Sequence, residues 1–68
     1  MDWTKSIARN ADREQMEGST SELIMCAMAL DRWDEAPEGW RNAPWKAWSF
    51  RLNDSQREAV QAWHDREE

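Results

Sequence analysis

The sequence predicts an all-α protein: one small domain over residues 1–68, with three helices and an ordered, Trp-rich loop between helices 2 and 3. Three observations predict this fold class. Apolar residues recur at helical spacing in three stretches, and residues typical of helix N-caps precede the second and third stretches. A chain of 68 residues has room for a single domain.

The first helix is expected from about residue 4 to residue 17, where Gly18 would end it. Its apolar face is thin, because Ile7 is the only large aliphatic residue in this stretch. We therefore expect this helix to be the least stable of the three. It should dock on the other helices chiefly through Trp3, Ile7 and Met16.

The second helix should be the centre of the fold. Ser19 followed by Glu22 matches a capping box, in which the serine oxygen accepts the amide of the third helical residue and the Glu22 side chain accepts the Ser19 amide in return. Residues 23–30 are apolar on every side of a helix, a pattern that requires full burial. Trp33 continues one row of this helix, and Pro37 is expected to end it, because a proline ring clashes with the preceding turn.

The stretch before the third helix is rich in tryptophan and turn formers. Residues 36–44 hold two prolines, a glycine and an asparagine around Trp40, and we expect this loop to be ordered, because a disordered tryptophan would leave a large apolar surface in water. Residues 45–52 fit either a short helix after Pro44 or a strand. We favour a helical turn followed by extended chain, since a lone strand has no partner in this sequence.

The third helix is preceded by three adjacent N-cap candidates, Asn53, Asp54 and Ser55, and Gln56 or Glu58 can complete a capping box. Its predicted inward face consists of Gln56, Ala59, Val60 and Trp63. Fraying is expected over residues 65–68, where acidic groups oppose the helix dipole.

Composition argues against several classes of protein. A net charge of −5 disfavours binding to a nucleic-acid backbone. Cys26 is the only cysteine, which excludes a disulfide within the chain and suggests a reducing cytosol. Cys26 and His64 together fall short of the roughly four ligands of a zinc site, so no metal or other cofactor is predicted. The longest apolar run, residues 23–30, is too short to span a membrane, and no targeting segment is visible, so a cytoplasmic protein is expected.

No catalytic residue is predicted. His64 beside Asp65 has the composition of a base and its orienting carboxylate, but a fraying terminus cannot hold that geometry. Cys26 lies among Met25, Ala27 and Met28, which suits a core residue better than a nucleophile. We therefore expect a protein that is not an enzyme.

An acidic group surrounds Trp33 near the end of the second helix. It is either a solvated helix end or a surface aimed at a basic protein, where charge steers the encounter and a tryptophan anchors it. Carboxylates at a helix C-terminus are unfavourable for stability, which gives the second interpretation some weight. The predicted partner-binding residues are Asp31, Trp33, Asp34, Glu35, Glu38 and Trp40.

Residues 40–51 interleave aromatic and basic side chains, as proteins that stack bases and neutralise phosphates do. The residues concerned are Trp40, Arg41, Trp45, Lys46, Trp48, Phe50 and Arg51. The alternative is that these aromatic residues complete a core that is poor in leucine, isoleucine and valine. We favour the core interpretation and keep a single-stranded nucleic-acid binder as an alternative function.

The sequence therefore favours a small acidic module that binds another protein with a basic surface. In size and charge it is similar to phage-encoded inhibitors of bacterial defence or transcription, including anti-CRISPR proteins, although no motif carries this likeness. Such an inhibitor would occupy a basic, nucleic-acid-binding surface of a host protein in the host cytoplasm. A homodimeric assembly adaptor is a further alternative, because a weak first helix would leave one side of residues 23–30 for a second subunit to cover.

Overall fold

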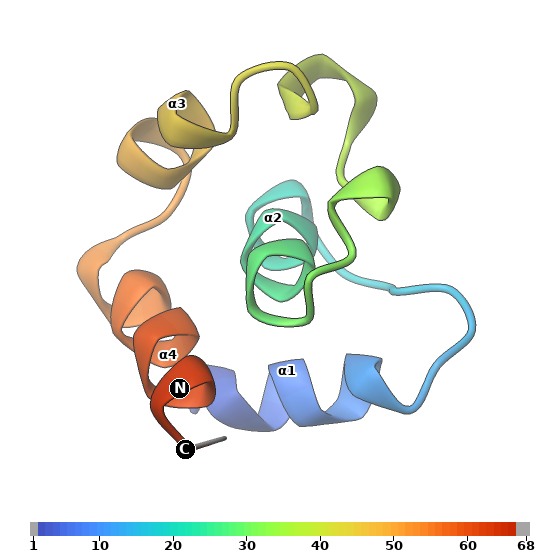
Figure 1. Ribbon diagram of the computed structural model, residues 1–68, viewed down its shortest axis with the longest axis vertical. Coiled ribbons are helices and arrows are strands. Elements are labelled where there is room, and N and C mark those ends of the chain that lie inside the picture. Colours follow the sequence, from blue (N-terminus) through green and yellow to red (C-terminus); the bar gives the residue numbers. More distant parts are fainter. Residues whose placement is uncertain (1, 67–68) are drawn as a thin grey trace.

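The computed structural model describes residues 2–66, which form four α-helices and two short 3-10 helices (Figure 1). In chain order they are α1 (Trp3–Ala11), α2 (Thr20–Ala29), η1 (Trp33–Glu35), η2 (Glu38–Trp40), α3 (Pro44–Phe50) and α4 (Asp54–Asp65). No strand occurs in this part of the chain. The all-α class is confirmed, whereas the number of helices is four and not three, because the connection after α2 contains a helix of its own.

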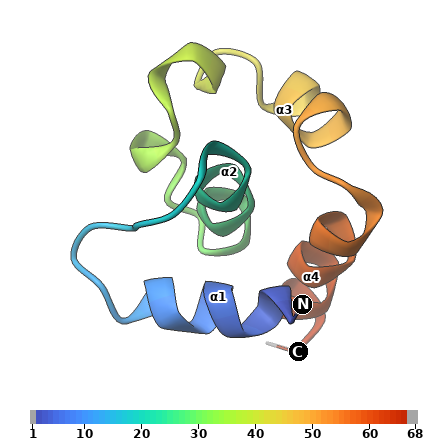
Figure 2. The same cartoon turned by 180° about the vertical axis from the view of Figure 1, so that it is seen from behind.

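α2 lies in the middle of the fold, and the rest of the chain surrounds it (Figures 1 and 2). It packs against α1, α3, α4 and η1. α1 and α4 lie below and beside it in Figure 1, while η1, η2 and α3 arch over the opposite side. No helix within residues 2–66 is long and apolar enough to cross a membrane.

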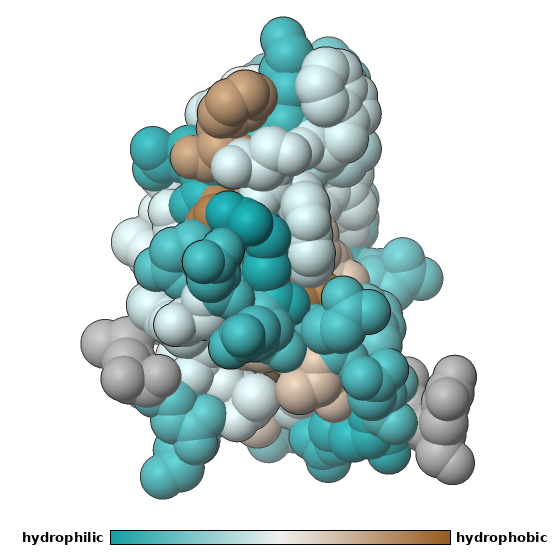
Figure 3. Space-filling model, turned by 90° about the vertical axis from the view of Figure 1, so that its left-hand side faces the viewer, coloured by the Kyte–Doolittle hydropathy of each residue, from teal (hydrophilic) through white to brown (hydrophobic). Residues whose placement is uncertain are grey.

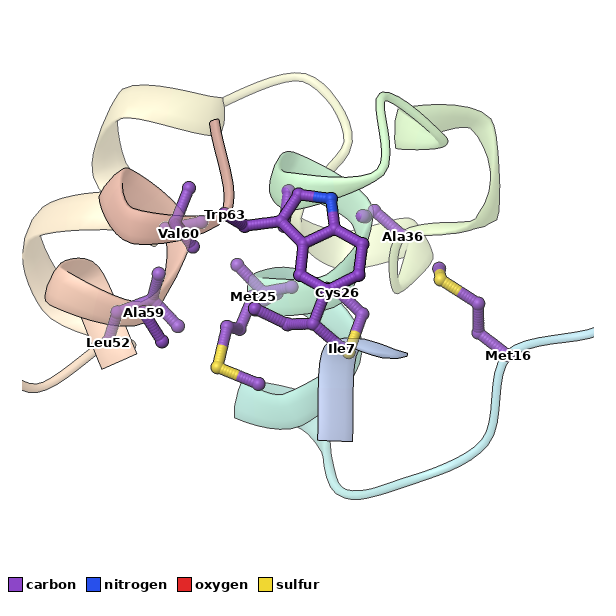
Figure 4. Packing of buried hydrophobic residues seen from close by; sticks show 13 residues of the cluster. Ile7, Met16, Met25, Cys26, Ala36, Leu52, Ala59, Val60 and Trp63 are labelled. Atoms are coloured by element: carbon purple, nitrogen blue, oxygen red, sulfur yellow. The ribbon is translucent and has the colours of Figure 1, made fainter. Parts of the chain in front are cut away.

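The core is centred on four residues of α2. Ile24, Met25, Cys26 and Ala27 have no exposed surface, as expected for a helix that is apolar on every side. Side chains from α1 and α4 converge on them, among them Ile7 and Trp63 (Figure 4). The other buried apolar residues are Met16, Ala29, Ala36, Ala47, Leu52, Ala59 and Val60. A single chain thus covers the centre of α2, which removes the packing reason to expect a second subunit on this helix.

α1 is shorter than the sequence predicts. It ends at Ala11, whereas the predicted helix continued to residue 17. Of its predicted docking residues, Ile7 and Met16 are buried and Trp3 is half-buried. Met16 reaches the core from the loop after the helix, so its contribution does not depend on helical spacing.

Residues 12–19 are held outside any helix by the buried side chain of Asn10. Its Nδ2 donates to the carbonyl oxygen of Glu17 at 3.1 Å, and its Oδ1 accepts from the Glu17 amide at 3.0 Å. These bonds satisfy backbone groups that a longer helix would otherwise pair. Gly18, predicted to end the helix, instead lies in the turn before α2 with a φ of +147°, a conformation that favours glycine.

α2 begins at the predicted cap, with the Ser19 hydroxyl accepting the Glu22 amide at 3.3 Å, but the return bond from the Ser19 amide to the Glu22 side chain is not formed, so only half of the predicted capping box is present. The helix ends at Ala29 and not near Pro37. Asp31, two residues after Ala29, has a left-handed backbone conformation with a φ of 56°. The Arg32 amide donates to the carbonyl oxygen of Ala27 at 2.9 Å, which is the 6→1 bond of a Schellman motif. Glycine usually fills this left-handed position, and aspartate is among the few other residues that adopt it. The prediction missed this helix end because no glycine marks it.

The connection between α2 and α4 is ordered, as predicted, but much of it is helical. Trp40 is half-buried and packs against the core. The helical turn predicted after Pro44 is present, but the extended chain predicted to follow it is wrong up to residue 50, because α3 continues from Pro44 through Phe50 with the proline at its first turn. Within α3, only Ala47 is buried.

α4 matches its prediction closely. Asn53 Oδ1 accepts from the Gln56 amide at 2.9 Å, and Gln56 Oε1 accepts from the Asn53 amide at 3.0 Å, which completes the capping box. The buried face is the predicted one: Gln56, Ala59, Val60 and Trp63. At the other end, His64 Nε2 lies 3.2 Å from the carbonyl oxygen of Met28 and links α4 to the last turn of α2. α4 continues to Asp65, and part of the predicted fraying, residues 67–68, lies outside the described residues.

Replacing Asn53 with alanine should lower the free energy of unfolding by about 1 kcal/mol, because both reciprocal bonds of the capping box depend on this residue. In a domain of this size, that loss corresponds to a decrease in Tm of about 4–8 °C. Thermal and urea denaturation followed by circular dichroism would measure it. The exposed neighbour Ser55 provides the control, and Ser55→Ala should change stability by less than about 0.5 kcal/mol. Equal effects of the two substitutions would contradict this role for the box.

Candidate functional site

The predicted partner-binding residues lie on three consecutive turns: the turn directly after α2, η1 and η2 (Figure 1). Asp31, Asp34 and Glu38 are exposed and form no ion pair with any residue in the range 2–66. We call these three residues the acidic edge. The other three, Trp33, Glu35 and Trp40, are half-buried and have contacts within the protein.

Arg32 explains why the acidic edge is uncompensated. It is the only basic residue between Glu22 and Glu38, and its guanidinium points into the protein. Nη1 donates to the carbonyl oxygens of Asn10 at 3.2 Å and Arg13 at 3.0 Å. Nη2 donates to that of Glu14 at 2.7 Å. The positive charge therefore holds the end of α1 and the following loop against η1 and leaves the neighbouring carboxylates facing solvent.

Glu35 belongs to this internal network. Its carboxylate forms an ion pair with Arg32 Nε and accepts a hydrogen bond from the Met16 amide at 3.3 Å. The hydrogen bond from the Arg32 guanidinium is the main cause that holds the pKa of Glu35 below its ordinary value of 4.5. Both oxygens are used inside the chain, so a role of Glu35 in partner binding would act through the position of the segment.

Trp33 and Trp40 also support the segment. Trp33 Nε1 donates to the carbonyl oxygen of Arg41 at 2.7 Å, and Arg41 Nε donates to that of Ala36 at 2.7 Å. Arg51 lies over the Trp40 ring, with 5.9 Å between the guanidinium carbon and the ring centroid. These contacts brace the turns that carry the acidic edge, while each indole keeps part of its surface accessible.

A second surface feature lies on α3. Trp45 and Phe50 are 66% and 76% exposed and are the large apolar side chains that this structure leaves in solvent. In Figure 3, which shows the side of the molecule with α3 and α4, a small hydrophobic area lies near the upper end, where α3 lies, and is bordered by white and teal residues. The ammonium nitrogen of Lys46, Nζ, lies 5.5 Å from the centroid of the Trp45 ring.

The core interpretation of residues 40–51 is therefore correct for some of the aromatic residues and wrong for others. Trp40 and Trp48 pack against the core, but Trp45 and Phe50 do not. The prediction did not take into account how α3 is rotated about its own axis, which decides which side chains face the core. Once Pro44 starts a helix and Ala47 faces the core, Trp45 falls on the outward side, which residue type alone does not reveal.

The chemically reactive thiol of Cys26 has a structural role. Cys26 has no exposed surface, and its Sγ lies 3.2 Å from Asn10 Nδ2, which donates to it. Burial raises the pKa of the Cys26 thiol. The prediction that Cys26 is a core residue is confirmed. Among residues 2–66, no group of three His, Cys, Asp or Glu side chains is arranged to hold a metal ion.

The surface also has a polar hollow of about 320 Å³ beside α1. It is lined by Ser6, Arg9, Asn10, Arg13, Glu17, Gly18 and Glu22. The buried amide of Asn10 is already satisfied by Glu17 and Cys26, and the Arg13 guanidinium pairs with Glu17 at 2.7 Å. The hollow therefore shows no unpaired buried group that would select a ligand.

Comparison of the chain with protein-family models, with curated proteins and with solved structures gives no significant match.

Replacing Arg32 with alanine should lower the free energy of unfolding by about 2 kcal/mol or more, because three backbone carbonyls and one carboxylate lose a charged donor. Arg32→Lys should recover only part of this loss, since an ammonium group cannot reproduce the guanidinium fork. Urea denaturation would measure both. Arg13 provides the matched control: its ion pair with Glu17 is exposed, so Arg13→Ala should cost less than about 0.5 kcal/mol. Similar losses for Arg13→Ala and Arg32→Ala would refute the special role of Arg32.

The stability of the protein should fall as the solution is acidified, in part through Glu35. Its pKa is lower in the folded chain than its ordinary 4.5, so its contribution is present above about pH 4.5 and disappears as the pH falls through the folded-state pKa. Glu35→Gln should reduce stability at neutral pH and make the acid dependence shallower. Part of the dependence should remain, because the Thr4 side chain lowers the pKa of Asp2 in the same direction. Urea midpoints between about pH 3 and pH 7 would test this, and an unaltered acid profile in the variant would contradict it.

Proposed function

We propose that this protein is a non-enzymatic module that binds another protein through the acidic edge. The observation that carries this proposal is the orientation of Arg32, whose guanidinium is bonded to three carbonyl oxygens and to Glu35 of the same chain. The one basic residue between Glu22 and Glu38 thus has its guanidinium bonded to other groups of the chain and not to Asp31 or Asp34. Three carboxylates remain on adjoining turns for a partner to neutralise.

The electrostatics of the segment support a basic partner. Between Glu22 and Glu38 the chain carries five acidic residues and one basic residue, so it is the most acidic part of the protein. Complementary charge speeds the encounter between two proteins and disfavours wrong partners. Such an interaction should weaken as salt concentration increases, because the carboxylates are exposed.

The rigidity of the segment supports the same function. Trp33, Arg41 and Ala36 are joined by two hydrogen bonds of 2.7 Å, which fix η1 relative to the turns after it. A surface that is already ordered loses less conformational entropy on binding. The half-buried indoles of Trp33 and Trp40 add aromatic area at its margin, as interfaces commonly do.

A basic protein surface that normally contacts nucleic acid is the partner that fits best. Carboxylates placed on successive turns present repeated negative charge, as phosphates do, so the two ligands would compete for the same lysines and arginines. The protein would then act as an inhibitor of a nucleic-acid-binding protein, in the manner of phage-encoded inhibitors such as anti-CRISPR proteins.

Charge reversal on the acidic edge tests the proposal. The variant Asp31→Asn, Asp34→Lys, Glu38→Lys keeps a residue that tolerates the left-handed backbone at position 31. It should bind a partner isolated from the native host at least about 10-fold more weakly, as measured by calorimetry, with an unchanged circular dichroism spectrum. Asp12→Asn, Glu14→Lys, Glu58→Lys changes exposed residues elsewhere by the same total charge and should retain affinity within about twofold. Equal losses in both variants would mean that net charge, and not the acidic edge, determines binding.

The exposed aromatic side chains of α3 favour a second candidate function, binding of single-stranded nucleic acid. Arg41, Lys46 and Arg51 lie in the same segment, and residues 39–53 contain no acidic residue. Base stacking on Trp45 would quench tryptophan emission when a short oligonucleotide is added at low salt. Unchanged emission would eliminate this candidate.

A further inference from the structure

α3 lies at the margin of the fold and is only partly used by it. One of its seven residues, Ala47, is buried, whereas Trp45 and Phe50 expose 66% and 76% of their surface. Two large apolar side chains on one short helix therefore forgo the stabilisation that burial would give them. Exposed apolar surface with a charged margin is typical of an interaction site.

The charges around α3 are arranged in two adjoining sets of opposite sign. Residues 39–53 carry three basic residues and no acidic residue, while residues 31–38 carry Arg32, which pairs with Glu35, and three further acidic residues without an ion pair. The two segments meet where η2, which carries Glu38, packs against α3. A basic segment therefore adjoins an acidic one in space, and Trp45 and Phe50 belong to the basic segment.

This arrangement is complementary to itself under a two-fold rotation. In an isologous interface, each contact between residue i of one copy and residue j of the other occurs twice. A second copy turned by 180° can set its acidic η2 against the basic α3 of the first, and the reverse pair forms at the same time. Neither an acidic partner nor a basic partner alone would satisfy both segments.

We propose that α3 and η2 form the interface of a homodimer, in which Trp45 and Phe50 of one copy are buried against a second copy of this chain. The aromatic side chains form the apolar centre of the interface, and Glu38 with Lys46 and Arg51 forms its charged rim. This division matches the general anatomy of protein interfaces. The interface lies on a different helix from α2, which the single chain already covers.

The required area is compatible with the size of the chain. A stable dimer buries about 800 Å² on each partner, which is roughly one sixth of the 4636 Å² that this chain exposes. Small domains of this length have marginal cores, and a second subunit supplies additional burial. Asp31 lies in the turn after α2 and Asp34 lies on η1, so both are outside the proposed interface. The dimer would therefore present two copies of these two carboxylates of the acidic edge. The proposed dimer does not depend on what the acidic edge binds.

Sedimentation equilibrium of the wild-type chain tests the dimer. Between about 1 and 100 μM, the weight-average mass should rise from that of one 8.1 kDa chain towards twice this value. Trp45→Ala combined with Phe50→Ala should raise the dimer dissociation constant by about 100-fold or more, since both side chains are central anchors. Circular dichroism should show a folded protein, because neither side chain belongs to the core. Glu58→Ala with Gln61→Ala, two exposed positions on α4, should leave the dissociation constant unchanged.

A wild-type chain that remains a monomer over this range would overturn the proposal. A dimer that persists in the folded Trp45→Ala, Phe50→Ala variant would overturn the interface, because the contacts would then lie elsewhere. A monomer that instead binds a short oligonucleotide, and loses this binding in the same variant, would overturn it in favour of a nucleic-acid surface on α3.

Discussion

The burial of α2 on all sides is the constraint on which the rest of the structure depends. Four consecutive residues of this helix have no exposed surface, yet the chain has few large aliphatic residues with which to cover them. Alanines such as Ala36, Ala47 and Ala59 let backbone approach closely, and tryptophans supply area where the gap is wider. The high tryptophan content is thus largely a consequence of covering one apolar helix with a short chain.

The end of α2 connects this constraint to the candidate binding surface. A left-handed Asp31 turns the chain sharply, and the turn directs the Arg32 side chain back across the end of α1. The same turn leaves the carboxylates of the acidic edge exposed to solvent. The turn at Asp31 therefore ends the central helix and places Arg32 against the carbonyl oxygens at the end of α1 and in the loop after it. It also leaves the uncompensated charge on which the proposed protein-binding function rests.

The parts that the sequence predicted are those governed by neighbours in the chain. The Ser19 cap, the Asn53–Gln56 box and the inward face of α4 depend on residues three or four positions apart, and all appear as expected. The length of α1 depends on a side chain that binds backbone seven residues away, and the end of α2 depends on an aspartate in a conformation that glycine usually adopts. Neither leaves a periodic pattern in the sequence.

The sequence by itself determined the helical class, the central place of α2 and the acidity of residues 22–38, because burial of apolar residues and local charge follow directly from composition and period. Only the tertiary structure decided which aromatic side chains reach the surface and which charges are paired. Trp45 and Trp48 are the same residue type on the same helix, and their environments differ because Ala47 docks on the core and sets the phase of α3. Likewise, Arg32 differs from other arginines of the chain because carbonyl oxygens distant in the sequence lie within its reach.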